Sequence, residues 1–355
     1  MLFLILSASA SEVELTPELQ VRPRFEFRSL DRDAAAVHAV TQRSRLGLTA
    51  TRGALSGHVV VQDVRAWGEE GHTLTDYAAD NLGVHSATLT WAPSDSVALT
   101  VGRQEIALNE HRLIGTVNWA QQAQSFDGLR LLAENGDMHV ELAAIALREG
   151  DTETWGTHDT ALMGIVSAGW KGADVIYIPE VDWATDSWRH TGGVYARGKA
   201  GILSGRIEAY GQLTPQDPAG MIGVRGGVAP ELSSKPTITL WWDSLSPRFN
   251  TLYATNHKFY GLADVGVFQL GDATRGLHDA ALKLKVSPTE KTSVKLDSHL
   301  FLAADDTSLL GEEIDLWGGA MLDGGLAIGV GGSAFLYADD TPTQLWMWLQ
   351  LDARL

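Results

Sequence analysis

The sequence predicts an all-β fold, a transmembrane antiparallel β-barrel of eighteen strands, and three observations lead to that prediction. Short segments with alternating apolar and polar side chains repeat from about residue 20 to the last residue. The connections between these segments alternate between tight turns and longer acidic loops. No apolar run approaches the roughly 18 residues that a spanning helix needs. The alternation places one set of side chains on each face of a strand, as a wall between lipid and water requires.

The composition is compatible with one large barrel domain. The chain has 355 residues, of which 45% are hydrophobic and 20% charged, with 37 glycines and no cysteine. The absence of cysteine excludes disulfides and thiolate metal sites. A net charge of -17 argues against nucleic acid as a partner. Residues 1–10 resemble a secretory signal peptide ending in Ala8-Ser9-Ala10, although no basic residue precedes the apolar run, and we expect a single barrel domain over 11–355.

Each predicted strand is an alternating run bounded by turn residues. The number of runs is even, as a closed antiparallel barrel with both termini on one side requires. The alternation is weakest at 160–169, 173–180 and 219–229. In chain order the predicted strands are 20–29, 41–51, 55–67, 84–92, 96–104, 124–132, 138–148, 160–169, 173–180, 190–199, 203–213, 219–229, 235–243, 279–287, 292–303, 310–321, 325–336 and 343–354.

The connections alternate in length, which supports the same topology. Short links follow the even-numbered runs, whereas the links that follow odd-numbered runs are mostly longer. This parity indicates short periplasmic turns and longer extracellular loops, and a soluble sandwich has no reason to keep it. The predicted long links are 68–83, 105–123, 149–159, 181–189 and 244–278.

The two faces of the runs differ in chemistry. One face is apolar, for example Leu345, Met347 and Leu349 near the end of the chain, and we expect it to meet lipid. Trp91 and Trp170 end their runs beside short turns, where an interfacial aromatic girdle would lie. The other face carries more basic than acidic groups, which predicts a cationic lumen that attracts anions.

We expect a solute to pass arginines on this inward face, because arginine holds a carboxylate or phosphate in a bidentate fork. The same side chains could instead pair with carboxylates in a structural network of the wall, and the sequence leaves both interpretations open. The predicted pathway residues are Arg22, Arg24, Arg28, Arg43, Arg45, Asp63, Arg65, Arg103, Arg130, Arg197, Arg206 and Arg225.

Four stretches carry a family resemblance: 62–68, 101–105 with 111–115, 125–130, and 255–261. In this order they resemble the alginate export family of outer-membrane porins. The resemblance implies an eighteen-stranded barrel in the bacterial outer membrane, with an arginine-lined pore for a polyuronate or similar anion. It also implies a lumen role for Asp63, Arg65, Arg103 and Arg130, and a loop folded inward as a gate, which we place at 68–83. Acidic loops would oppose a polyanion, so small solutes stay an equal alternative.

We therefore expect a monomeric outer-membrane channel without cofactor or metal that passes anionic oligo- or polysaccharides, or small anionic solutes, and touches outer-membrane lipid and lipopolysaccharide. One alternative is a gated or plugged barrel that acts as a surface receptor or adhesin. Another is an enzyme in which His257, Lys258 and Tyr260, with Asp264 nearby, abstract a proton beside a uronate carboxylate. No nucleophile elbow, zinc-protease helix or P-loop motif is present, and we expect no enzyme.

Overall fold

The computed structural model describes residues 12–29, 36–69, 82–148, 160–266 and 274–355. The predicted signal peptide at 1–10 and most of the predicted gate at 68–83 lie outside the described residues. No helix among the described residues has the length and apolar character needed to cross a membrane.

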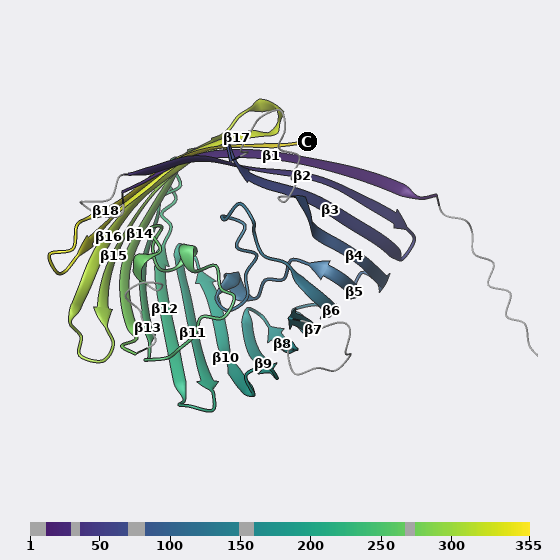
Figure 1. Ribbon diagram of the computed structural model, residues 1–355, viewed down its shortest axis with the longest axis horizontal. Helices are drawn as coiled ribbons and strands as arrows, with labels where there is room; N and C mark the ends of the chain where they lie inside the picture. The colour runs from purple at the N-terminus through teal and green to yellow at the C-terminus, as the bar shows by residue number, and fades with distance from the viewer. Residues whose placement is uncertain (1–11, 30–35, 70–81, 149–159, 267–273) are drawn as a thin grey trace, which may run out of the picture.

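Eighteen antiparallel strands form one closed sheet (Figure 1). Each strand pairs with its neighbours in sequence, and β1 also pairs with β18, which closes the barrel. The predicted fold class and strand count are therefore confirmed, including the three strands with weak alternation. The strands are β1 (Glu14–Ser29), β2 (Val37–Arg52), β3 (Leu55–Ala66), β4 (Leu82–Ser94), β5 (Val97–Gln104), β6 (Phe126–Asn135), β7 (Met138–Arg148), β8 (Ala161–Trp170), β9 (Ala173–Asp182), β10 (Ser187–Ala200), β11 (Leu203–Leu213), β12 (Ala219–Val228), β13 (Thr237–Leu245), β14 (Leu277–Thr289), β15 (Thr292–Ala303), β16 (Leu309–Met321), β17 (Leu326–Tyr337) and β18 (Gln344–Arg354), with the 3-10 turns η1 (Asn109–His111), η2 (Asn256–Lys258) and η4 (Asp323–Gly325).

The connections mostly follow the predicted parity, but the predicted long link at 181–189 is wrong. β9 ends at Asp182 and β10 begins at Ser187, so only a tight turn joins them. The polar residues that suggest a loop instead extend both strands. Arg189 lies opposite Glu180 and their side chains form an ion pair at 2.6 Å, which stabilises the strand ends across the pair.

Apolar side chains point outward and polar ones inward along the strands, as the alternation predicts. On β11, Ile207 is 49% exposed, whereas its neighbours Arg206 and Glu208 are buried. The apolar row predicted at Leu345, Met347 and Leu349 of β18 lies on the outer face. Trp91 and Trp170 are more than half exposed beside short turns, as an interfacial girdle requires.

β5 approaches β4 closely at Gly102, whose φ is +116°. A Cβ atom there would lie 2.1 Å from the carbonyl oxygen of Ala87. We expect Gly102→Ala to destabilise the barrel by about 1–3 kcal/mol, measured as a lower urea midpoint in detergent micelles. Gly226→Ala is the matched control, because open space surrounds that position, and its midpoint should not move. An unchanged midpoint for the Gly102 variant would contradict the close approach.

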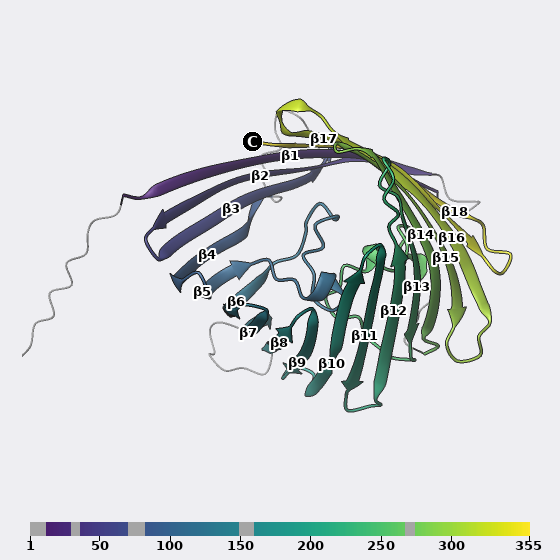
Figure 2. The same ribbon diagram turned by 180° about the vertical axis from the view of Figure 1, so that it is seen from behind.

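Two long connections fold back between the strands. The first inward segment (105–125) links β5 to β6, and the second inward segment (246–266) follows β13. Both views of the ribbon show these segments inside the ring of strands (Figures 1 and 2). Side chains such as Ile114 and Phe259 are buried against inward side chains at the extracellular ends of the wall strands, such as Ile178 and Phe335. A hydrophobic core thus lies inside the barrel, and its buried apolar area holds the inward segments in place.

Candidate functional site

The two inward segments are joined to each other by a parallel β-bridge between Ile114 and Tyr253. The backbone N–H of Gly115 donates to the carbonyl oxygen of Tyr253 at 2.9 Å, and the N–H of Tyr253 donates to Leu113 at the same distance. The segments therefore form one unit, attached to the wall at both ends.

Arg112 is the main polar anchor of this unit and is 1% exposed. Its guanidinium donates through Nε to Glu208 at 2.9 Å, through Nη2 to Asp243 at 2.9 Å and through Nη1 to the Tyr260 hydroxyl at 2.8 Å. The same group lies 3.7 Å from the centre of the Phe259 ring. One arginine of the first inward segment thus satisfies two buried wall carboxylates and holds the second inward segment as well.

Two arginines of β1 hold the far part of the first inward segment. Arg22 donates to the carbonyl oxygens of Asn118 at 2.7 Å and Ala120 at 2.9 Å. Arg24 donates to the carbonyl oxygen of Trp119 and lies over its ring at 4.1 Å. Both arginines are less than 5% exposed. They donate to backbone carbonyls and to the side-chain amide oxygens of Gln121 and Gln350, so these arginines shape the lumen and do not meet a solute.

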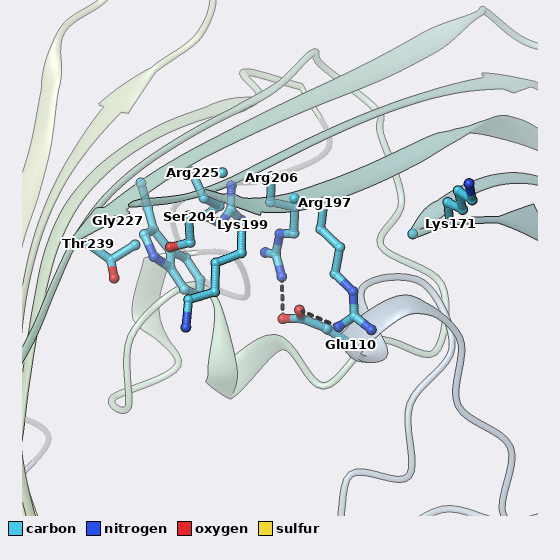
Figure 3. A pocket seen from close by; sticks show the side chains of 13 residues that line it. Glu110, Lys171, Arg197, Lys199, Ser204, Arg206, Arg225, Gly227 and Thr239 are labelled. Carbon is cyan, nitrogen blue, oxygen red and sulfur yellow. Dashed lines mark hydrogen bonds and ion pairs between the residues drawn. The ribbon is translucent and has the colours of Figure 1, made fainter. Parts of the chain in front are cut away.

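A cavity of about 490 Å³ lies beside Glu110 of η1 (Figure 3), and Lys171 and Gly172 of the short turn after β8 also line it. We name it the basic cavity, because five cations line it against one carboxylate among the described lining residues, that of Glu110. The cations are Lys171, Arg197, Lys199, Arg206 and Arg225.

Three of these arginines form a row across adjacent strands. Arg206 lies opposite Arg197 on one side and Arg225 on the other. Directly opposed like charges repel, so the row needs anions. Glu110 supplies one, ion-paired with Arg206 and 3.6 Å from Arg197 (Figure 3), while Asp243 accepts from Arg225 at 2.9 Å. The Arg197 side chain nevertheless remains 63% exposed to the cavity.

Glu110 titrates below the usual range. Burial alone would raise its pKa, but the charges of Arg206 and Lys258 outweigh burial and lower the pKa of the Glu110 carboxyl. The stability that this ion pair gives to the docked segment is fully present above the ordinary glutamate pKa. It is lost only as the pH falls through the lowered folded-state value.

Protonation of Glu110 removes the one carboxylate among the described lining residues, so we expect anion preference to rise as the pH falls through the lowered pKa of this carboxyl. Glu110→Gln should show that raised preference already at neutral pH. The check is the reversal potential of both proteins in a salt gradient, from neutral pH to about pH 3. The two curves should converge at the acidic end. Parallel curves would show that Glu110 does not control the cavity.

Most predicted pathway residues do face the lumen, but the wall or the inward segments occupy many of them. Arg43 is 1% exposed and donates toward Asn118 at 3.4 Å, and Arg45 donates to Gln62 at 2.7 Å. The structural-network interpretation therefore holds for these groups, whereas Arg197 is open to solute. The inward residues from the predicted set are Arg22, Arg24, Arg28, Arg43, Arg45, Arg130, Arg197, Arg206 and Arg225.

The predicted lumen positions of Asp63 and Arg65 are wrong. Arg45 faces the lumen and lies opposite Gln62, so Gln62 also faces the lumen. The next residue, Asp63, therefore lies on the outer face, as Val61 does. Asp63 and Arg65 form an ion pair at 2.7 Å on that face. A shift of one residue in the register exchanges the faces, and the alternation of this polar strand end does not fix the register.

The lumen position of Arg103 stays a prediction. Arg103 lies opposite Asp127, two residues along from the outward pair of Val101 and Leu129, and forms an ion pair with Asp127 at 2.6 Å. Its side chain also lines a small cavity with Gln122 and Ser125 of the first inward segment. Arg130, by contrast, faces the lumen and pairs with Glu141 at 2.8 Å.

Sequence reasoning missed the residues at the centre of the site, Arg112 and Glu110. Both lie in a connection, where charged side chains usually meet water. The apolar residues near them in sequence are a usable signal. Ile106, Leu113 and Ile114 are buried, and large apolar side chains of this kind predict that the connection packs against the protein. Arg112 also lies within the 111–115 stretch of the family resemblance, without a role assigned to it.

The residues considered for catalysis are separately engaged. His257 Nδ1 lies 3.1 Å from Asp264, and Lys258 Nζ lies 3.4 Å from Glu110. The Tyr260 hydroxyl accepts from Arg112 in the buried anchor. These side chains therefore do not converge on a common point where a substrate proton could be taken.

Comparisons with known proteins agree with the fold. Residues 13–176 match the family model described as Alginate export. No curated protein matches the chain. Two solved structures align with nearly the whole chain. The outer membrane protein opdK from Pseudomonas aeruginosa is 10% identical, with a TM-score of 0.69, and the alignment covers 96% of this chain and 98% of opdK. OccAB4 from Acinetobacter baumannii has a TM-score of 0.68, is 11% identical and covers 98% of this chain and 99% of its own.

The family match contains the stretches at 62–68, 101–115 and 125–130, so the resemblance is confirmed over the first part of the chain. At these identities the solved structures establish the architecture. The closed wall with an apolar exterior and the family match place the protein in the bacterial outer membrane, as a channel. The chain is an outer-membrane β-barrel of porin architecture, and its residues 13–176 carry the sequence pattern of the alginate export family.

Proposed function

We propose that this protein is an outer-membrane channel through which small anionic solutes diffuse, guided by the basic cavity. The observation that carries the proposal is the excess of cations in that cavity, in a chain whose net charge is -17. A low-dielectric wall focuses the field of such a cluster into the lumen and raises the local concentration of anions.

Arg197 and Lys199 are the residues that we expect to meet the solute first. Both are exposed in the cavity, and Lys199 forms no ion pair with any described residue. Arg206, in contrast, has a side chain only 7% exposed and is held by Glu110. An arginine fork beside a lysine point charge binds a carboxylate with enough freedom for it to leave again.

The inward segments favour small anions over a polymer as the solute. They occupy the lumen above a cavity of about 490 Å³, so an alginate-like polyuronate would pass only if they moved. We further propose that residues 1–10 direct export and that 11–355 form the single barrel domain. The protein works as a monomer within lipid and lipopolysaccharide, because β1 and β18 already close the wall. No cofactor and no chemical step belong to this function.

One observation supports a second candidate, a gated or plugged barrel that acts as a surface receptor. The inward segments form a hydrophobic core with the extracellular part of the wall, and such a core resists displacement. A plugged barrel would keep its fold in membranes but conduct nothing.

Flux into proteoliposomes tests the proposed function. We expect galacturonate to enter faster than galactose, and galactose faster than galactosamine, because these rings match in size and differ in charge. Equal rates for the three would show that charge does not guide passage. A folded barrel that admits none of them would favour the plugged candidate.

A further inference from the structure

A second lumen cavity, of about 340 Å³, shares Trp241 with the basic cavity but has a different lining. We propose that it is a binding site for one six-membered ring that bears a carboxylate. This inference rests on the proposed function, whose ligand it specifies. We name the site the tryptophan–lysine cavity; its lining includes Trp241, Trp317, Trp348, Lys283, Lys285 and Lys295.

Two lysines mark the position of the carboxylate. Lys285 of β14 and Lys295 of β15 lie directly opposite each other on the inward face. Directly opposed like charges destabilise a sheet, and neither lysine has an ion-pair partner among the described residues. Their neighbour Lys283 does have one, Asp297 at 3.1 Å. An anion between Lys285 and Lys295 would relieve their repulsion, as Asp297 does for Lys283.

Two indoles form the surface on which the ring would pack. Trp317 is paired with Lys295 across β15 and β16, and the Lys295 ammonium lies 4.8 Å from the Trp317 ring. Trp348 occupies the room left by Gly331, where a Cβ atom would lie 2.8 Å from the indole. Glycine at 331 therefore lets Trp348 lie close to the wall beside Trp317. The indole faces can pack against the apolar face of a ligand ring, while the neighbouring ammonium group binds a carboxylate on that ring.

Two of the tryptophans that line the cavity carry indole N–H groups without acceptors in the described part of the chain. Nε1 of Trp241 and Nε1 of Trp348 are buried, and no described residue accepts from them. Trp348 as a whole is 5% exposed. A buried N–H without an acceptor is costly, so an oxygen of a bound ligand would stabilise the site. Hydroxyl groups around the ring meet this need, and the hydroxyls of Thr239 and Thr255 line the same cavity.

Side chains of the two inward segments form the roof of the cavity. Trp119 of the first inward segment packs edge-on against Trp348, with ring centres 4.7 Å apart. His257 of the second inward segment stacks on Trp119 at 5.2 Å. Both roof residues belong to the joined unit that Arg112 holds, so the cavity cannot extend upward while the unit is docked.

Calorimetric titration of the purified, detergent-solubilised protein tests the site with four probes. We expect galacturonate to bind at least about tenfold more tightly than galactose, which lacks the charge, and than acetate, which lacks the ring. Benzoate separates the two sources of a ring carboxylate: weaker binding than galacturonate indicates a sugar acid, and tighter binding an aromatic acid. Acetate that binds as tightly as galacturonate, or no binding of either ring acid, would overturn the inference.

Adjacent tryptophans on β13 give a matched pair of variants. Trp241→Phe keeps a ring but removes the inward N–H, and we expect about tenfold weaker galacturonate binding with little change for benzoate. Trp242→Phe is the control, because Trp242 faces outward and is 42% exposed. Equal affinity for the two variants would contradict a role for the Trp241 donor.

Lys295→Gln separates binding from folding. It should abolish binding of the ring acids while leaving the unfolding midpoint unchanged or higher, because it removes one of two opposed charges. Binding that persists in this variant would overturn the inference. Galacturonate binding without selective flux would refute the proposed function alone, and selective flux without binding would refute this site alone.

Discussion

Arg112→Ala is expected to release the inward segments and raise single-channel conductance. The substitution removes the cation that pairs with Glu208 and Asp243, both of which are buried. An uncompensated buried carboxylate is strongly unfavourable, so docking of the segments should weaken by about 3–5 kcal/mol. Conductance in planar bilayers reports the wider lumen, and limited proteolysis reports the exposed segments.

Arg103→Ala is the matched control for that experiment. It also removes an arginine from an ion pair, but the arginine and aspartate side chains of this pair are 40% and 57% exposed. Exposed pairs contribute less than about 1 kcal/mol, so conductance and protease resistance should stay at wild-type values. An Arg112→Ala protein with wild-type conductance and full protease resistance would show that this anchor does not hold the segments.

Replacing Arg197 and Lys199 together by glutamate is expected to abolish anion preference. Both side chains are exposed in the basic cavity, so the exchange leaves as many carboxylates as cations among its described lining residues. The field in the lumen should then no longer favour anions. The reversal potential in a salt gradient measures this loss as a shift toward zero.

The control for this second prediction is the double exchange of Arg65 and Arg103 to glutamate. It alters the net charge of the protein by the same amount, but neither residue lines the basic cavity. The reversal potential should remain that of the wild type. If this distant pair changed selectivity as much as the cavity pair, charge placement in the basic cavity would not be the cause.

The strand pattern was predictable because lipid and water demand opposite chemistry on two faces of each strand. Ile207 and Arg206 therefore reveal their faces from sequence alone. The pattern no longer predicts which face a side chain occupies at strand ends beyond the apolar band, because both faces are polar there. Asp63 and Arg65 lie in such a place, and only the pairing of Arg45 with Gln62 shows that they point outward.

The inward segments were not predictable because their positions depend on contacts distant in sequence. Arg112 meets Glu208 and Asp243 only after the barrel has closed. Arg22 becomes an anchor only because the carbonyl of Asn118 is brought beside it. The excess of inward arginine suggested a ligand pathway, and much of that excess instead holds the protein's own chain inside the barrel.

The most direct test of the account is the reversal potential of the wild-type protein, reconstituted in a planar bilayer with unequal salt on the two sides. If the basic cavity guides solutes, conductance should rise in steps and the sign of the reversal potential should indicate anion selectivity. Added galacturonate should reduce the current by occupying the lumen. A reversal potential whose sign indicates cation selectivity would contradict the claim that the cationic lumen of this barrel selects its solutes.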